Sequence, residues 1–151
     1  MEIPVSLSHN QLCIFDPSLD APFNDWTDMH VAQGFTWRPG SASFAVDSGH
    51  PTAIVDVALA SEPPAVDGAE SAIRVPFEIP SSGQVEIGGV LGGAELSLPP
   101  GAYALHFLAP PTEDAPFKLA FVASKDVEPS VLKEGSRAKV QHRYLMVASP
   151  A

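Results

Sequence analysis

The segment AIRVPFEI, residues 72–79, places large apolar side chains at every second position and its two charged side chains at positions between them. Successive side chains of an extended chain point to opposite faces, so a period of two separates a buried face from a solvated one. Arg74 and Glu78 lie on the polar face. The segment therefore predicts a β-strand with one face in a core. The apolar face holds Ile73, Val75, Phe77 and Ile79.

The same pattern recurs along the chain at spacings near ten residues, which predicts an all-β protein, an antiparallel β-sandwich or a barrel. Its 16 prolines and 11 glycines supply the many turns that such a fold needs. We favour the sandwich, as a single domain over residues 1–151. The further predicted strands are IPVSL and QLCIF near the N-terminus, then 43–47, 52–60, 84–88, 94–98, 102–109, 117–124 and 141–149. Residues 125–139 lack periodicity and are predicted as a connecting loop.

One short helix is predicted near residues 25–33, within FNDWTDMHVAQGF (23–35). Asn24 or Asp25 can act as the N-cap, and Asp28 follows Asp25 by three residues, as in a capping box. Gly34 suits the position after the last helical residue. The two aspartates would then also lie at the positive end of the helix dipole.

The two tryptophans of the chain, one within this helix and one after it, have different expected positions. Trp26, Met29 and His30 fall at helical spacing, and this apolar face predicts that Trp26 anchors the helix in the core. Trp37 closes a strand just before the turn Arg38-Pro39-Gly40, so it is either a core residue or an exposed anchor at the rim.

The charge is strongly acidic and unevenly distributed. The net charge is −10, and residues 1–117 contain 15 acids but only two bases, Arg38 and Arg74. Residues 118–151 contain six bases and three acids. Such a field repels nucleic acid and attracts a basic protein surface, although acidity also serves solubility.

The strand order predicts where these acids gather. If consecutive strands from residue 52 onward are joined as hairpins, alternate loops share one end of the sandwich. The loops 61–70, 88–93 and 110–116 would then form a single acidic pole without a base. Its acids would be Glu62, Asp67, Glu70, Glu113 and Asp114.

Catalytic and metal-binding patterns are missing from the sequence. The five histidines have no paired spacing, and no cysteine cluster accompanies them, so neither a zinc site nor an enzyme is expected. His106 is expected to be exposed or at a rim, and Cys13 is expected to be a buried, inert thiol. GGVLGG (88–93) lacks the nucleotide-loop pattern and is read as a hairpin connection. No cofactor is predicted.

Two further alternatives concern metal and location. DPSLDAPFNDWTD (16–28) has four aspartates without the EF-hand spacing, which leaves a calcium- or carbohydrate-binding β-sandwich module as the alternative function. The single cysteine and the absence of an apolar N-terminal run indicate a cytoplasmic protein with no membrane partner.

Several segments occur in an order that resembles the competence protein J (ComJ)-like family. They are SLSHNQLCIFD, DWTDMHVAQGF, GSASFAV, IRVPFEIP and LSLPPGAYALHF, which together span about residues 6–125. LPPGAYAL alone is a common turn-and-strand pattern, whereas the ordered set with DWTD is more specific. The segments 61–70 and 125–151 depart from the resemblance.

The resemblance implies an inhibitor of a DNase, either a NucA-like DNA-entry nuclease or a secreted DNase toxin to which the chain would give immunity. The acidic composition is compatible with this function, because carboxylates can occupy the phosphate-binding surface of a nuclease. No inhibitory residue follows from the resemblance. From charge and predicted placement, we expect two acidic surfaces and one aromatic anchor to bind the partner. The residues are Asp16, Asp20, Asp25, Asp28, Trp37, Glu62, Asp67, Glu70, Glu113 and Asp114.

Overall fold

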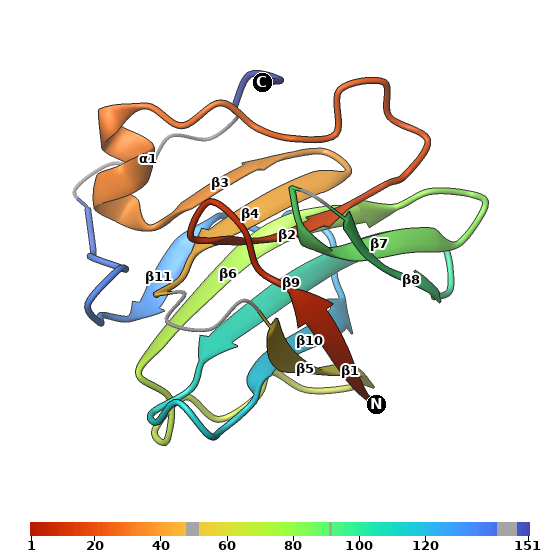
Figure 1. The fold of residues 1–151 in the computed structure, drawn as a ribbon. Coiled ribbons are helices and arrows are strands. Elements are labelled where there is room, and N and C mark those ends of the chain that lie inside the picture. The colour runs from red at the N-terminus through yellow and green to blue at the C-terminus, as the bar shows by residue number, and fades with distance from the viewer. Residues whose placement is uncertain (48–51, 91, 142–147) are drawn as a thin grey trace.

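Two β-sheets pack face to face and enclose the core (Figure 1). The computed structural model describes residues 1–47, 52–90, 92–141 and 148–151. Within these ranges a six-stranded sheet has the order β1-β5-β10-β9-β6-β11 and a five-stranded sheet the order β3-β4-β2-β7-β8. The six-stranded sheet contains β1 (Glu2–Ser6), β5 (Thr52–Ala60), β6 (Ser71–Ile79), β9 (Gly101–Ala109), β10 (Phe117–Ala123) and β11 (Ser130–Lys133). The five-stranded sheet contains β2 (Gln11–Phe15), β3 (Phe35–Arg38), β4 (Ser41–Ala45), β7 (Gln84–Gly89) and β8 (Gly92–Ser97).

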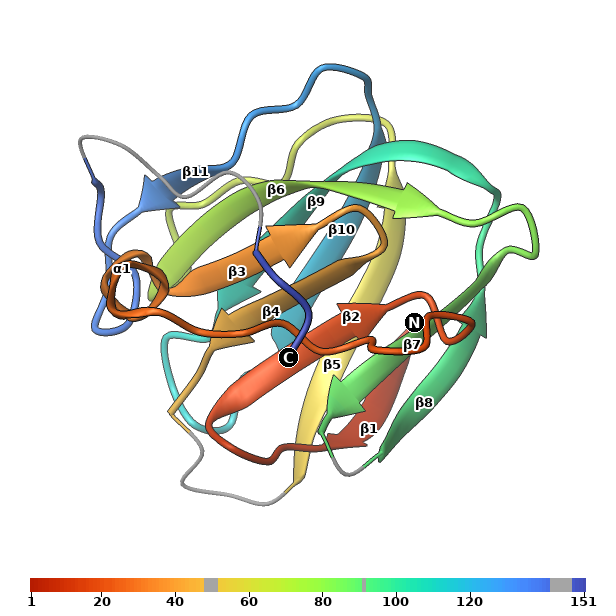
Figure 2. The same cartoon turned by 90° about the horizontal axis from the view of Figure 1, so that it is seen from above.

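The predicted all-β sandwich is confirmed, and β6 behaves as its sequence predicts. Its four apolar residues are at most 3% exposed, and Glu78 on the opposite face is exposed. Figure 2 shows the strands of the two sheets crossing each other at an angle. Aromatic rings from the two sheets stack in the core between them. Phe44 of β4 stacks on Phe107 of β9 with centroids 4.4 Å apart and planes 3° apart. This contact ties the middle of one sheet to the middle of the other.

The pairing of β5 with β10 is parallel, unlike the other strand pairs described. Because β6 and β10 are both antiparallel to β9, β5 and β6 run in the same direction. Residues 61–70 therefore cross from one end of the sheet to the other. This crossover contradicts the prediction of hairpin connections from residue 52 onward, and with it the placement of the whole 61–70 loop at one end.

The crossover also explains a second difference from the sequence prediction. Val66 and Ala69 pack on Ala72 and Leu108, so the loop covers part of the outer face of the six-stranded sheet. His106 lies on that outer face, yet it is only 3% exposed. The prediction of an exposed or rim position for His106 was wrong, because loops cover a face that alternation alone marks as solvated.

The helix α1 (Asp28–Gln33) begins later than predicted. Its N-cap is Thr27, whose side chain accepts a hydrogen bond from the backbone N–H of His30. The His30 Nδ1 accepts in return from the Thr27 N–H at 3.1 Å, which completes a capping box. Asn24 and Asp25 are not caps. Asn24 is buried and holds the preceding segment, with its Nδ2 donating to Thr36 Oγ1 at 3.2 Å.

The late start of α1 also removes the predicted apolar face. Trp26 precedes the helix and is half-buried, with its Nε1 donating to Gln11 Oε1 at 3.2 Å. It lies outside the core cluster, so the prediction of a core anchor was wrong. Met29 is 49% exposed, and His30 alone of the three is buried.

The C-terminal region contains a strand, β11, that the sequence pattern did not predict. β11 lies inside the predicted loop 125–139 and pairs with the edge of β6. Most of the predicted strand 141–149 falls outside the described residues. Residues 148–151 run between β3 and the segment 23–25, with the Ala148 N–H donating to the Trp37 carbonyl at 2.7 Å and the Asp25 N–H to Ser149 at 2.8 Å.

Replacing Gly34 with alanine is expected to lower the free energy of unfolding by at least about 2 kcal/mol. Gly34 has φ +90°, and an added Cβ would overlap the carbonyl oxygen of Arg137. Gly68→Ala is the matched control, because an added Cβ at Gly68 meets nothing within 4 Å. Urea denaturation of both variants measures the difference, and equal stabilities would contradict the packing described at Gly34.

Acid is expected to destabilise the fold through His30. Burial lowers the pKa of His30 from 6.5, so the unfolded chain binds a proton more readily than the folded chain. The contribution of His30 is therefore complete above pH 6.5 and is lost as the pH falls through and below that value. His30→Gln keeps an acceptor for the Thr27 N–H but cannot titrate, so its stability should fall less between pH 7 and pH 5.

Urea denaturation across this pH range provides the measurement. Met29→Gln is the control on the same helix, since it alters an exposed side chain and removes no titrating group. Its pH dependence should match that of the unaltered chain. A His30→Gln variant with an unchanged pH dependence would contradict the prediction.

Candidate partner-binding surface

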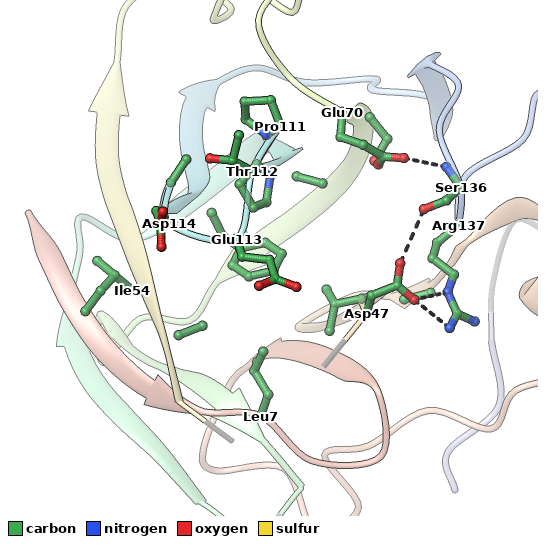
Figure 3. A pocket seen from close by; sticks show the side chains of 18 of the residues that line it. Leu7, Asp47, Ile54, Glu70, Pro111, Thr112, Glu113, Asp114, Ser136 and Arg137 are labelled. Carbon is green, nitrogen blue, oxygen red and sulfur yellow. Dashed lines mark hydrogen bonds and ion pairs between the residues drawn. The ribbon is translucent and has the colours of Figure 1, made fainter. Parts of the chain in front are cut away.

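A cleft of about 530 Å³ opens at the end of the sandwich where β5 begins and β9 ends (Figure 3). The turn 110–116 forms one side, and the segment that follows β11 forms another. Leu7, Ile54 and Phe117 contribute apolar surface to it. Ile54 is 43% exposed, so part of this surface is open to a partner.

Four carboxylates line the cleft, and two of them are held by the segment after β11. Asp47 Oδ1 lies 2.6 Å from Arg137 Nη2 and accepts from Arg137 Nε at 2.7 Å. Glu70 Oε1 accepts from the backbone N–H of Ser136 at 2.5 Å. Arg137 thus places one internal cation beside the acidic cleft.

Glu113 and Asp114 belong to the turn 110–116, and both are exposed. In Figure 3 the Glu113 carboxylate points into the cleft between Asp114 and Asp47. Among the described residues that line the cleft, four are acids and one is an arginine, so acidic side chains predominate there. Carboxylates beside an apolar wall suit a basic side chain that has a long aliphatic stem, such as lysine or arginine.

The second expected acidic surface, residues 16–28, belongs to a segment that lies on the outer face of the five-stranded sheet (Figure 2), with Asn24 bonded to Thr36 of β3 and Trp26 to Gln11 of β2. Arg38 of β3 holds this segment by hydrogen bonds: its Nε donates to Asn24 Oδ1 at 2.8 Å, and its Nη2 donates to the Ala21 carbonyl. Asp16 is committed to its own turn, because Oδ1 accepts from both the N–H and the hydroxyl of Ser18. Asp20 is exposed.

Asp25 and Asp28 are exposed beside the start of α1. The other end of this helix reaches the cleft, because Gly34 lies against the carbonyl of Arg137 and Arg137 pairs with Asp47. A helix of six residues is about 9 Å long. Asp28 therefore lies about one helix length from the segment that borders the cleft.

The remaining expected residues are dispersed. Glu62 follows β5 at the end of the sheet opposite the cleft, since Ala60 pairs with Val122 while Ser71 pairs with Ala109. Asp67 is exposed along the crossover, where its carbonyl accepts from Lys133 Nζ at 2.8 Å. Trp37 is only 8% exposed and belongs to the core, the first of its two expected positions.

Asp47 is the cleft residue that sequence reasoning missed. It comes after Val46, beyond the end of β4, and ends the alternating segment SFAVD (43–47), which marks it as the first polar residue beyond a buried strand. Its ion-pair partner is Arg137, which lies 90 residues further along the chain. Alternation, a local pattern, could not predict this contact.

The described residues contain neither a metal-binding group nor an activated thiol. No three His, Cys, Asp or Glu side chains among them come together in a way that could hold a metal ion. Cys13 is 1% exposed, and burial raises the pKa of its thiol to about 11. Such a thiol stays protonated and inert at neutral pH. None of the described helices is long and apolar enough to cross a membrane.

The sequence profile of the family described as competence protein J (ComJ) matches residues 4–127. The chain belongs to the ComJ family. A solved structure, the crystal structure of ComJ from Bacillus subtilis, described as an inhibitor of the DNA degrading activity of NucA, has the same fold. The TM-score is 0.69 at 23% identity, over 82% of this chain and 96% of that one. No curated protein matches the sequence.

The residues that line the cleft lie partly inside and partly outside the range matched by the ComJ profile. Asp47, Glu70, Glu113 and Asp114 lie within the matched residues, whereas Arg137 and its neighbours follow them. The segment that neutralises part of the cleft therefore lies outside the part of the chain that matches the ComJ profile.

Removing the internal cation is expected to change the cleft's charge without unfolding the protein. The Arg137 and Asp47 side chains are 48% and 62% exposed, so their ion pair contributes at most about 1 kcal/mol. Arg137→Gln should therefore lower the free energy of unfolding by no more than about 1 kcal/mol in urea denaturation. A loss several times larger would show that the pair is a structural support of the cleft.

Proposed function

We propose that this ComJ family member is a protein inhibitor of a DNase, and that it binds the nuclease through the acidic cleft and the neighbouring start of α1. Family membership carries the first half of the proposal. The gathering of four carboxylates around a cleft with an apolar wall supports the second half. The partner would be a NucA-like nuclease or a secreted DNase toxin.

The physical basis is the surface that a DNase must present. DNA carries a dense row of phosphates, so a nuclease binds it through lysine and arginine side chains. Carboxylates fixed on a rigid β-scaffold can take the place of these phosphates and accelerate the encounter by electrostatic steering. The apolar surface around Ile54 and Phe117 would add the desolvated contact that gives a complex its lifetime.

Direct titration of the protein into a NucA-like DNase, with DNA cleavage as the readout, tests the function. Stoichiometric inhibition that weakens with salt is expected, because charge pairs between exposed surfaces are screened. The absence of both inhibition and binding, with a NucA-like nuclease and with a DNase toxin, would refute the proposed function.

Charge reversal locates the surface. The double variant Glu113→Lys/Asp114→Lys should weaken inhibition at least ~10-fold, and Asp25→Lys/Asp28→Lys should also weaken it. Glu62→Lys/Asp67→Lys is the matched control, since it changes the net charge equally but lies away from the cleft. If the control variant weakens inhibition as much as the others, overall charge and not this surface determines the affinity.

Arg137→Gln provides an independent check, because it should strengthen the electrostatic attraction to a basic partner, whereas the charge-reversal variants should weaken it. It removes a positive charge from the cleft and releases Asp47 for a partner. If the cleft binds a basic surface, this variant should associate faster than the unaltered chain at low salt. Slower association would indicate that Arg137 itself contacts the nuclease.

A further inference from the structure

A second hollow, of about 430 Å³, lies on the outer face of the six-stranded sheet. Its floor comes from Arg74 of β6, Ala104 and His106 of β9, and Val122 of β10. Pro63 on the crossover and the segment 123–128 after β10 form its sides. It shares no residue with the acidic cleft and has no part in the proposed inhibition.

His106 is the unusual feature of this hollow. It is 3% exposed, and its Nδ1 is buried without a hydrogen-bond partner among the described residues. Burial, reinforced by the charge of Arg74, lowers the pKa of His106, so the ring is neutral at pH 7. A neutral imidazole has one N–H donor and one acceptor, and buried polar atoms of this kind are rarely left unpaired.

Arg74 lies directly beside His106, because the two residues are paired in the register of β6 and β9. Its Nε donates to the Glu128 carbonyl at 3.2 Å, which fixes the guanidinium against the segment after β10. Within the described ranges, no ion pair joins Arg74 to Asp126 or Glu128, although both acids line the hollow. The terminal nitrogens of Arg74 remain available as donors.

The other arginine of the N-terminal part of the chain shows the contrast. Arg38 uses its nitrogens on Asn24 and on the carbonyls of Ala21 and Phe23, and so has an evident structural role. Arg74 makes one backbone contact and faces a hollow that also holds an unpartnered buried imidazole.

These groups together match one class of ligand. The terminal nitrogens of an anchored guanidinium can donate to both oxygens of a carboxylate. The neutral imidazole of His106 borders the same hollow and adds a polar group beside them. Ala104 and Val122 offer a small apolar floor for a short side chain. Asp126 and Glu128 disfavour an anion of higher charge and attract an ammonium group.

We propose that this hollow binds a small zwitterion of the free amino-acid class. Its carboxylate contacts Arg74 and His106, and its ammonium faces Asp126 and Glu128. The site is independent of nuclease binding, so loss of one function leaves the other intact.

The test is an NMR titration of the full chain labelled with ¹⁵N in the histidine rings, with L-alanine as the probe. A saturable shift of the His106 signals is expected, with a Kd of about 1 mM, as befits a ligand of few atoms. Acetate and inorganic phosphate should bind at least several-fold more weakly. No saturable shift up to about 50 mM alanine would overturn the proposal, and so would acetate or phosphate binding as tightly as alanine.

Variants separate the site from general charge effects. Arg74→Gln should abolish the alanine-dependent shift, whereas Arg137→Gln, the same change at the acidic cleft, should retain it. His106→Leu should raise the thermal midpoint, because it removes an unpartnered buried polar atom, yet it should lose alanine binding when followed by calorimetry. Alanine binding that survives in both Arg74→Gln and His106→Leu would refute the assignment.

Discussion

The parallel pairing of β5 with β10 determines the arrangement of the rest of the molecule. That pairing makes β5 run in the same direction as β6, so the chain after β5 crosses the sheet before β6 begins. That crossing covers part of the outer face with Val66 and Ala69 and separates Glu62 from Glu70. Glu70 thereby joins the acids of the turn 110–116 and Asp47 at one cleft, and Pro63 closes one side of a second hollow.

The two hollows differ in the state of their charged groups. In the acidic cleft, Asp47 and Glu70 accept hydrogen bonds from residues beyond β11, and Glu113 and Asp114 belong to an exposed turn. On the outer face, a fixed arginine and a desolvated histidine share a floor with small apolar side chains. The first arrangement offers several carboxylates to the basic side chains of a protein surface, whereas the second offers one fixed cation with two acids on its border, which suits a small zwitterion.

Local pattern predicted strands such as β6 well, because alternation there separates a fully buried face from a more exposed one. It failed where a distant segment alters what is exposed. His106 alternates as a surface residue and is buried by loops. β11 is only four residues long, and its two apolar residues are adjacent, so it shows no alternation that would mark it as a strand. The helix start was misplaced because Thr27 and His30 form a capping box in which histidine replaces the usual acid or amide. Of the expected acids, Glu70, Glu113 and Asp114 line the cleft. Glu62 lies at the opposite end of the sheet, and its position could be predicted only by knowing that residues 61–70 cross the sheet.

The extended residues 148–151 have a consequence for the association state of the protein. β3 is the outermost strand of its sheet, and its carbonyl at Trp37 is already bonded to Ala148. An uncovered strand edge offers a template on which a second chain can add its own strand. The C-terminal segment occupies this template from within the same molecule. It thereby limits edge-to-edge assembly on the side of the sandwich that carries Asp25.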